Sequence, residues 1–159
     1  MVRWADVLDD SGQQGMLATA VGSQTKSATS LTAMAHILLP TDFSDGSLNA
    51  CAYALDLFGA DGHTYTLVHS YMDPVPGYAA MVDMSSALYA ASVEGMAGFA
   101  KRFRELKGAE TAVVSTEVVY GPLAAALTGV CEEKGVDIIA MGTQGAAGVA
   151  LFGSNAGAM

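Results

Sequence analysis

The feature that most constrains the fold is an alternation of short apolar runs and segments with helical spacing, which begins near residue 34. Four of these runs have the composition of buried strands. They cover residues 37–39, 64–71, 111–120 and 136–141. Segments of helical length separate them, and such crossovers favour parallel pairing with right-handed connections. The sequence therefore predicts an α/β domain built on a parallel sheet.

The three predicted helices are bounded by capping residues or glycine. They run from Ser44 or Asp45 to Gly59, from Ser85 or Ser86 to Gly108, and from Gly121-Pro122 to Gly135. The second helix contains Gly95 and Gly98, and each glycine weakens a helix by about 1 kcal/mol relative to alanine. We therefore expect these two glycines to mark close packing.

The first 33 residues differ in composition from the rest of the chain. Ser, Thr, Gln and Gly fill 14 of these 33 positions, and no helical or strand period continues for more than a few residues. A polar segment of this kind buries too little apolar surface to fold alone. We expect residues 1–33 to be a disordered N-terminal extension and residues 34–159 to form the domain.

The charge balance excludes several classes of partner. Among 159 residues, 16 are Asp or Glu and 7 are Lys or Arg, which gives a formal net charge of −9. Binding to nucleic-acid phosphates or to an anionic membrane is not expected for such a chain. The first residues do not show the basic-then-apolar order of a secretion signal, and no apolar run reaches the roughly 18 residues that cross a bilayer. We expect a cytoplasmic protein.

Neither catalysis nor metal binding has positive support in the sequence. His36, His63 and His69 show no metal-type spacing, and Cys51 and Cys131 fall on apolar helix faces as packed thiols do. No nucleophile–base pair stands out. We therefore predict no catalytic residue and no metal ligand.

Two polar loops follow predicted strands where ligands bind in open α/β sheets, beyond the carboxyl ends of the strands. The first loop, residues 41–44, contains Asp42. Its carboxylate can accept hydrogen bonds from an exocyclic amine or a ribose hydroxyl. It can equally accept them from its own backbone in an Asx turn. Sequence alone leaves both interpretations open.

The second loop follows the fourth predicted strand and is rich in glycine. It contains Gly142, Gly145, Gly148 and Gly153, and then Ser154. Glycines let backbone N–H groups approach phosphate oxygens closely, and a serine hydroxyl adds a donor. A flexible, tightly packed turn explains the same glycines. The loop contains neither a P-loop nor a dinucleotide-binding fingerprint.

Four motifs taken together resemble the universal stress protein family. They are Leu39–Ser44 (LPTDFS), Leu67–His69 (LVH), Met141–Gly145 (MGTQG) and Gly153–Asn155 (GSN). The resemblance runs from about residue 34 to the end of the chain. It implies a three-layer α/β/α sandwich with a five-stranded parallel sheet. This is a Rossmann-like fold of the adenine nucleotide alpha hydrolase-like type, usually dimeric.

The resemblance also implies a binding site for an adenine nucleotide, ATP or AMP. It does not indicate whether magnesium binds with the nucleotide. Asp42 would meet the adenine or ribose with Thr41 beside it, and Ser70 would lie near the base. The residues that would wrap the ribose and phosphates are Gly142, Gly145, Gly153 and Ser154.

This sequence departs from the family pattern in two ways. Seven residues, none of them Lys, Arg or His, separate Gly145 from Gly153, where ATP-binding members have nine. The chain also stops at Met159, so the fourth helix and fifth strand of the family are expected to be missing. The strand at 136–141 would then lie at a sheet edge, which promotes self-association.

The sequence thus favours a stress-response module that binds an adenine nucleotide, working as a homodimer or through other self-association. The first alternative is a family member that binds no nucleotide and acts through dimer or protein-partner contacts. The second is a slow ATPase.

Overall fold

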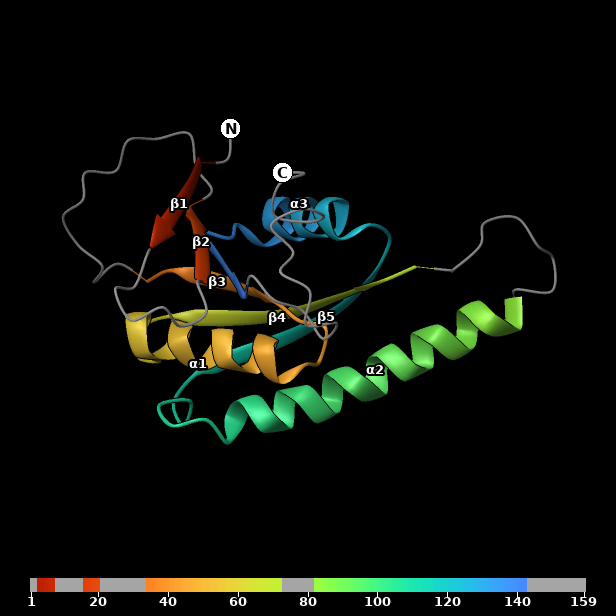
Figure 1. The fold of residues 1–159 in the computed structure, drawn as a ribbon, viewed down its shortest axis with the longest axis horizontal. Coiled ribbons are helices and arrows are strands. Elements are labelled where there is room, and N and C mark those ends of the chain that lie inside the picture. Colours follow the sequence, from red (N-terminus) through yellow and green to blue (C-terminus); the bar gives the residue numbers. More distant parts are fainter. Residues whose placement is uncertain (1–2, 8–15, 21–33, 73–81, 143–159) are drawn as a thin grey trace.

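One mixed sheet organises the molecule, and its strand order is β1-β2-β6-β3-β4-β5. The computed structural model describes residues 3–7, 16–20, 34–72 and 82–142 (Figure 1). The strands are β1 (Arg3–Val7), β2 (Met16–Ala20), β3 (His36–Pro40), β4 (Thr64–Tyr71), β5 (Val113–Tyr120) and β6 (Ile138–Gly142). The helices are α1 (Asp45–Phe58), α2 (Val82–Arg104) and α3 (Leu123–Lys134).

The four strands β6, β3, β4 and β5 are parallel and form the centre of the fold. The chain passes from β3 to β4 and β5, and then returns to place β6 on the other side of β3. The strand order therefore reverses between β3 and β6. This confirms the predicted parallel α/β sheet and marks the edge where such folds bind ligands.

Helices cover both faces of the sheet, as the predicted sandwich requires. Figure 1 shows α1 and α2 on one face and α3 on the other. A larger apolar cluster joins the sheet to α1 and α2 through Tyr65, Phe99 and Phe103. A smaller cluster joins it to α3 through Leu127 and Val130. The domain thus has a separate core on each face of the sheet.

Strand β3 shows why the short apolar run at 37–39 predicts a central strand. Ile37, Leu38 and Leu39 are all 0% exposed. Ile37 and Leu39 pack toward α1 and α2, whereas Leu38 packs toward α3. Side chains alternate between the two faces of a strand, so a strand covered on both faces is apolar at every position.

The predicted helix ends of α1 and α3 are confirmed. The side chain of Ser44 accepts a hydrogen bond from the Ser47 N–H at 3.1 Å, as an N-cap does. Gly135 ends α3 in the left-handed conformation with φ of 63°, which a glycine adopts without steric cost. Helix α2 begins at Val82, earlier than the predicted serines, and ends at Arg104.

The structure corrects the expectation that the N-terminal segment has no regular structure. Strands β1 and β2 form an antiparallel pair, and β2 pairs in turn with β6. The fourth predicted strand therefore lies inside the sheet rather than at its edge. The N–H and C=O groups along β6 need partners, and β2 supplies them although its own sequence has no clear strand period.

The remainder of residues 1–33 lies outside the described residues. The same holds for the expected loss of a C-terminal helix and strand after Gly142. Over the described part of the chain, no helix is both long and apolar enough to span a membrane.

Candidate functional site

The candidate site lies where the carboxyl ends of β3 and β6 run side by side. Ile37 pairs with Ile138, and Leu38 pairs with Ile139. The same register carried forward sets Thr41 level with Gly142. On the other side of β3, the Thr41 N–H donates to the Val68 carbonyl at 2.9 Å. The loops after β3 and β6 therefore leave the sheet from adjacent positions.

Thr41 is buried, and its hydroxyl organises the loop between β3 and α1. Its Oγ1 lies 2.9 Å from the Oγ of Ser47 and accepts a hydrogen bond from the Phe43 N–H at 2.9 Å. Its carbonyl accepts a hydrogen bond from Nδ1 of His69 at 2.8 Å. These contacts give Thr41 a structural role in the loop.

Asp42 is exposed and begins an Asx turn. One carboxylate oxygen accepts hydrogen bonds from the backbone N–H of Ser44, at 3.1 Å, and from its hydroxyl. The Asx turn that sequence analysis left open is therefore present. The turn therefore orients the Asp42 carboxylate at the start of the loop.

Phe43 adopts an unusual backbone conformation between Asp42 and Ser44. Its φ of 65° lies in the left-handed region, which costs a non-glycine residue roughly 1–2 kcal/mol. Its ring lies against the imidazole of His69, with ring centroids 4.2 Å apart and planes inclined by 30°. Packing of the ring therefore offsets a strained backbone.

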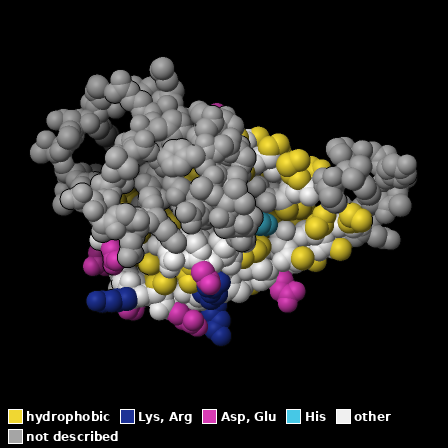
Figure 2. Space-filling view, viewed as in Figure 1, with side chains coloured by type: hydrophobic (Ala, Val, Ile, Leu, Met, Phe, Trp, Pro, Cys, Tyr) yellow, Lys and Arg dark blue, Asp and Glu magenta, His cyan; other side chains and the backbone are white. Residues whose placement is uncertain are grey.

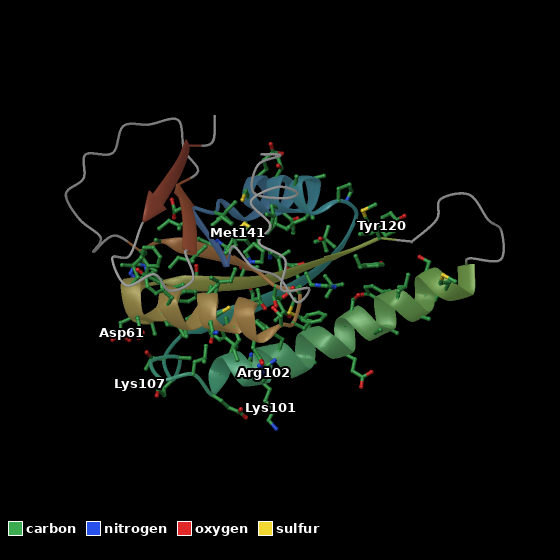
Figure 3. The ribbon with its side chains drawn as sticks, viewed as in Figure 1. Asp61, Lys101, Arg102, Lys107, Tyr120 and Met141 are labelled. Carbon is green, nitrogen blue, oxygen red and sulfur yellow. The ribbon has the colours of Figure 1, made fainter. Side chains whose placement is uncertain are left out.

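Helix α2 contacts the same loop from the other side. Arg102 donates to the carbonyl of Phe43 at 3.3 Å and forms an ion pair with Asp45. Figure 3 shows the neighbouring Lys101 pointing away from the sheet. The loop is thus held by β4, through His69, and by α2, through Arg102.

Of the other residues predicted for the nucleotide site, the structure describes Ser70 and Gly142. Ser70 is half-buried on β4, paired with Val119, and the register of β3 with β4 sets it level with Asp42. Gly142 ends β6 and pairs with Met16 of β2. Thr41, Asp42, Ser70 and Gly142 thus lie at the carboxyl ends of three adjacent strands. Gly145, Gly153 and Ser154 lie outside the described residues.

The other titratable groups of interest belong to the framework. His36 bonds to the carbonyl of Lys134 and to the hydroxyl of Thr66, and His63 accepts a hydrogen bond from the Ala35 N–H. Burial raises the pKa of Cys51 to about 12, as expected for a packed thiol. Within the described ranges, no group of three His, Cys, Asp or Glu side chains could hold a metal ion.

Sequence analysis assigned no role in the candidate site to four residues that shape the loop after β3. They are Phe43, His69, Gly95 and Arg102. Phe43 and His69 lie in motifs of the family resemblance, and Gly95 was expected to mark close packing, whereas Arg102 carried no signal. Gly98 carried the same signal as Gly95, yet a Cβ added there would meet no atom within 4 Å.

These features define a class: an α/β protein with its candidate ligand site at the point where the strand order reverses. Comparison with protein families makes the assignment specific, because the model of the universal stress protein family matches residues 34–159. The chain belongs to the universal stress protein family.

Solved structures share the fold at low sequence identity. The universal stress protein UspA from Lactobacillus plantarum is 18% identical, with a TM-score of 0.57 over 72% of this chain and 80% of that one. A Mycobacterium tuberculosis H37Rv protein, Rv1636, is 23% identical, with a TM-score of 0.51 over 79% of this chain and 85% of that one. A universal stress protein in complex with cAMP is 20% identical, with a TM-score of 0.50 over 69% of this chain and 76% of that one. No curated protein matches the sequence.

Proposed function

We propose that this chain is a stress-response module that binds an adenine nucleotide, ATP or AMP, beyond the carboxyl ends of β3, β4 and β6. The observation that carries the proposal is the adjacency of β3 and β6, which brings the loops that contain Asp42 and Gly142 to one edge of the sheet. Family membership supports it, as does the related fold solved in complex with cAMP.

Each proposed contact follows from the chemistry of its residue. Asp42 accepts hydrogen bonds from the adenine amine or a ribose hydroxyl, and Ser70 lies near the base. The ribose and phosphates are held by the loop residues Gly142, Gly145, Gly153 and Ser154. The stretch between Gly145 and Gly153 has no Lys, Arg or His, so backbone N–H groups bind the phosphates. Thr41 acts indirectly, because its hydroxyl holds the loop that presents Asp42.

Nucleotide occupancy acts as a signal in this proposal. A ligand that contacts both loops stabilises the bound conformation of residues 142–154, and this change alters contacts with a second copy or a partner protein. The expected result is slower amide hydrogen exchange in residues 142–154 at saturating ATP. Unchanged exchange would remove this step while leaving nucleotide binding itself in place.

The decisive experiment is calorimetric titration of the purified protein with ATP and with AMP, after mass spectrometry for a co-purified nucleotide. The variant is Asp42→Asn, which keeps an acceptor for the Asx turn but loses the charge. We expect binding to weaken by roughly tenfold or more, because hydrogen bonds to charged groups contribute about 1.5–3 kcal/mol. The matched control is Asp56→Asn, at an exposed position of α1. Absence of binding by the unmodified protein would overturn the proposal.

A second role, self-association, is favoured by an apolar surface, here called the tyrosine surface, made of half-buried Tyr71 and exposed Met72, Tyr89 and Tyr120. The ring of Tyr71 lies 6.0 Å from that of Tyr89 and 5.5 Å from that of Tyr120. Figure 2 shows hydrophobic side chains gathered over this end of α2 and of β4–β5. Large exposed apolar patches are typical of interaction sites. A second copy is the proposed partner, because contact through these four uncharged side chains brings no like charges together in two chains that each carry −9.

This second role predicts a concentration-dependent increase in mass by light scattering. Tyr89→Ser should shift the protein toward the monomer, because Tyr89 is 50% exposed in this surface. Tyr53→Ser is the control, since Tyr53 is 44% exposed on α1, a helix that contributes no residue to the tyrosine surface. A protein that is monomeric at every concentration would exclude this role.

A further inference from the structure

The loop that presents Asp42 is shaped by a residue far away in the sequence. Gly95, in the middle of α2, faces the ring of Phe43. A Cβ atom added at Gly95 would lie 2.6 Å from Cε2 and 2.9 Å from Cδ2 of that ring. Cβ atoms essentially never approach another heavy atom this closely, so the ring occupies the space that any other residue at position 95 would need.

The same ring is also in contact with β4. Phe43 stacks on His69, and His69 donates from Nδ1 to the carbonyl of Thr41 at 2.8 Å. A carbonyl only accepts hydrogen bonds, so the proton of this contact is on Nδ1. The Phe43 ring is therefore enclosed between α2 and β4, and β4 also holds the backbone two residues before the ring.

The enclosed ring fixes the backbone on both sides of it. Phe43 has a φ of 65°, a conformation that persists only where its surroundings impose it. Asp42 precedes it and Ser44 follows it, and these two residues form the Asx turn that directs the carboxylate. A shift of the ring would rotate this turn and, with it, the carboxylate of Asp42.

We infer that Gly95 is a positioning residue for the nucleotide site: it admits the Phe43 ring between α2 and β4 and so sets the direction of the Asp42 carboxylate. The inference rests on the proposed function, since it assigns to α2 the control of the same site. A methyl group at position 95 displaces the ring and turns Asp42 away from the ligand.

The experiment compares Gly95→Ala with Gly98→Ala, both in the middle of α2. Gly98 is a matched control because a Cβ there meets nothing within 4 Å, and both changes favour the helix equally. We expect Gly98→Ala to keep the Kd for ATP and AMP within about twofold and Gly95→Ala to raise it about tenfold or more. Backbone amide chemical shifts of Phe43 and Ser44, measured without ligand, should change in Gly95→Ala alone.

A double-mutant cycle separates positioning from a general loss of stability. Phe43→Ala removes the ring and should itself weaken binding, and in that background Gly95→Ala should have no further effect, because the new methyl group then has space. If Gly95→Ala does not fold, Phe43→Ala alone tests the inference. Its Kd for ATP and AMP is then compared with its melting temperature, and binding should weaken even where the melting temperature shows that the variant is folded.

Two outcomes are distinguishable. If the unmodified protein binds neither ATP nor AMP, the proposed function fails and the positioning role fails with it. If the unmodified protein binds nucleotide and the Kd values of Gly95→Ala and Phe43→Ala equal that of the unmodified protein, the inference alone is overturned.

Discussion

His69 and Thr41 are joined by a hydrogen bond from the imidazole Nδ1 to the backbone carbonyl, 2.8 Å long, which ties the end of β4 to the loop after β3. The same imidazole supports the ring of Phe43. One side chain therefore makes two contacts of different kinds with the candidate site, and substitutions can separate them.

Replacement of His69 should show how much each contact contributes to stability. His69→Phe keeps a ring but loses the donor, and we expect the free energy of unfolding to fall by about 1 kcal/mol. His69→Ala loses the stacking contact as well, which adds roughly 0.5–1.5 kcal/mol or more. Urea unfolding measures both. Equal losses in the two variants would mean that the ring contact contributes nothing.

Ser44 serves two functions, so its replacement should affect stability and binding together. Ser44→Ala removes the N-cap of α1, at a cost of about 1 kcal/mol, and removes a hydrogen-bond partner of Asp42. Nucleotide binding should weaken as well. Thr128→Ala on α3 is the control, because that exposed hydroxyl donates to the carbonyl of Ala124 within its own helix. Calorimetry would contradict the second function if Ser44→Ala bound like Thr128→Ala.

The pairing of β2 with β6 predicts different effects of proline at two positions. Ala18 lies on β2 between β1 and β6, opposite Ala140, so Ala18→Pro removes a hydrogen bond inside the sheet. Ala5 lies on β1, at the edge of the sheet among the described strands, where proline is better tolerated. We expect faster amide exchange at Ala140 and more light scattering for Ala18→Pro than for Ala5→Pro. Identical behaviour would argue against β2 as the cover of β6.

The framework of this fold could be predicted because each central strand carries its own signal. Residues 37–39 are apolar at three consecutive positions, and the structure buries all three on the two faces of β3. Helix α1 likewise has a serine cap before it and a glycine after it. These signals are local, so sequence alone is sufficient to find them.

Strands β1 and β2 carry no such signal. β2 joins the sheet by pairing with β6, which lies more than a hundred residues later in the chain. The backbone groups of β6 pair with the short segment MLATA of β2, which in turn pairs with RWADV of β1. A partner distant in sequence leaves no trace in the local pattern.

The candidate site was predictable only in outline, for a related reason. Asp42 and Gly142 follow predicted strands, and the strand order places those strands together. The contact of Phe43 with Gly95 and the bond of His69 to Thr41 arise from tertiary packing. Spacing along the chain shows the residues that lie at a strand end, but packing decides the direction of their side chains.

The buried thiol of Cys51 should resist alkylation in the native protein. Burial raises its pKa to about 12, so the reactive thiolate is scarce at pH 8. We expect iodoacetamide to modify Cys51 at pH 8 only after unfolding, with Cys131→Ser used to isolate the signal. The raised pKa also means that the protonated thiol stabilises the fold below about pH 9 and loses this contribution toward pH 12. Rapid native labelling would contradict the burial of Cys51.

Substitutions of Arg102 can show whether this residue affects nucleotide binding through its charge or through the contacts that its guanidinium makes. Its guanidinium contacts both the Phe43 carbonyl and Asp45, but the ion pair is exposed, with side-chain exposures of 40% and 89%. Exposed ion pairs contribute at most about 1 kcal/mol, so Arg102→Gln should lower the free energy of unfolding only slightly. Its effect on nucleotide binding should be larger than its effect on stability, because the lost contact holds the backbone beside Asp42.

Two further variants decide whether the guanidinium acts through its shape. Arg102→Lys keeps the charge, but one ammonium group cannot reproduce the planar fork that reaches both acceptors. We expect it to bind nucleotide more weakly than the unmodified protein. Lys101→Gln removes the same charge from the adjacent exposed residue, which points away from the sheet, and should bind normally (Figure 3). If Arg102→Gln and Lys101→Gln weaken binding equally, the effect comes from net charge, and the guanidinium does not hold the loop.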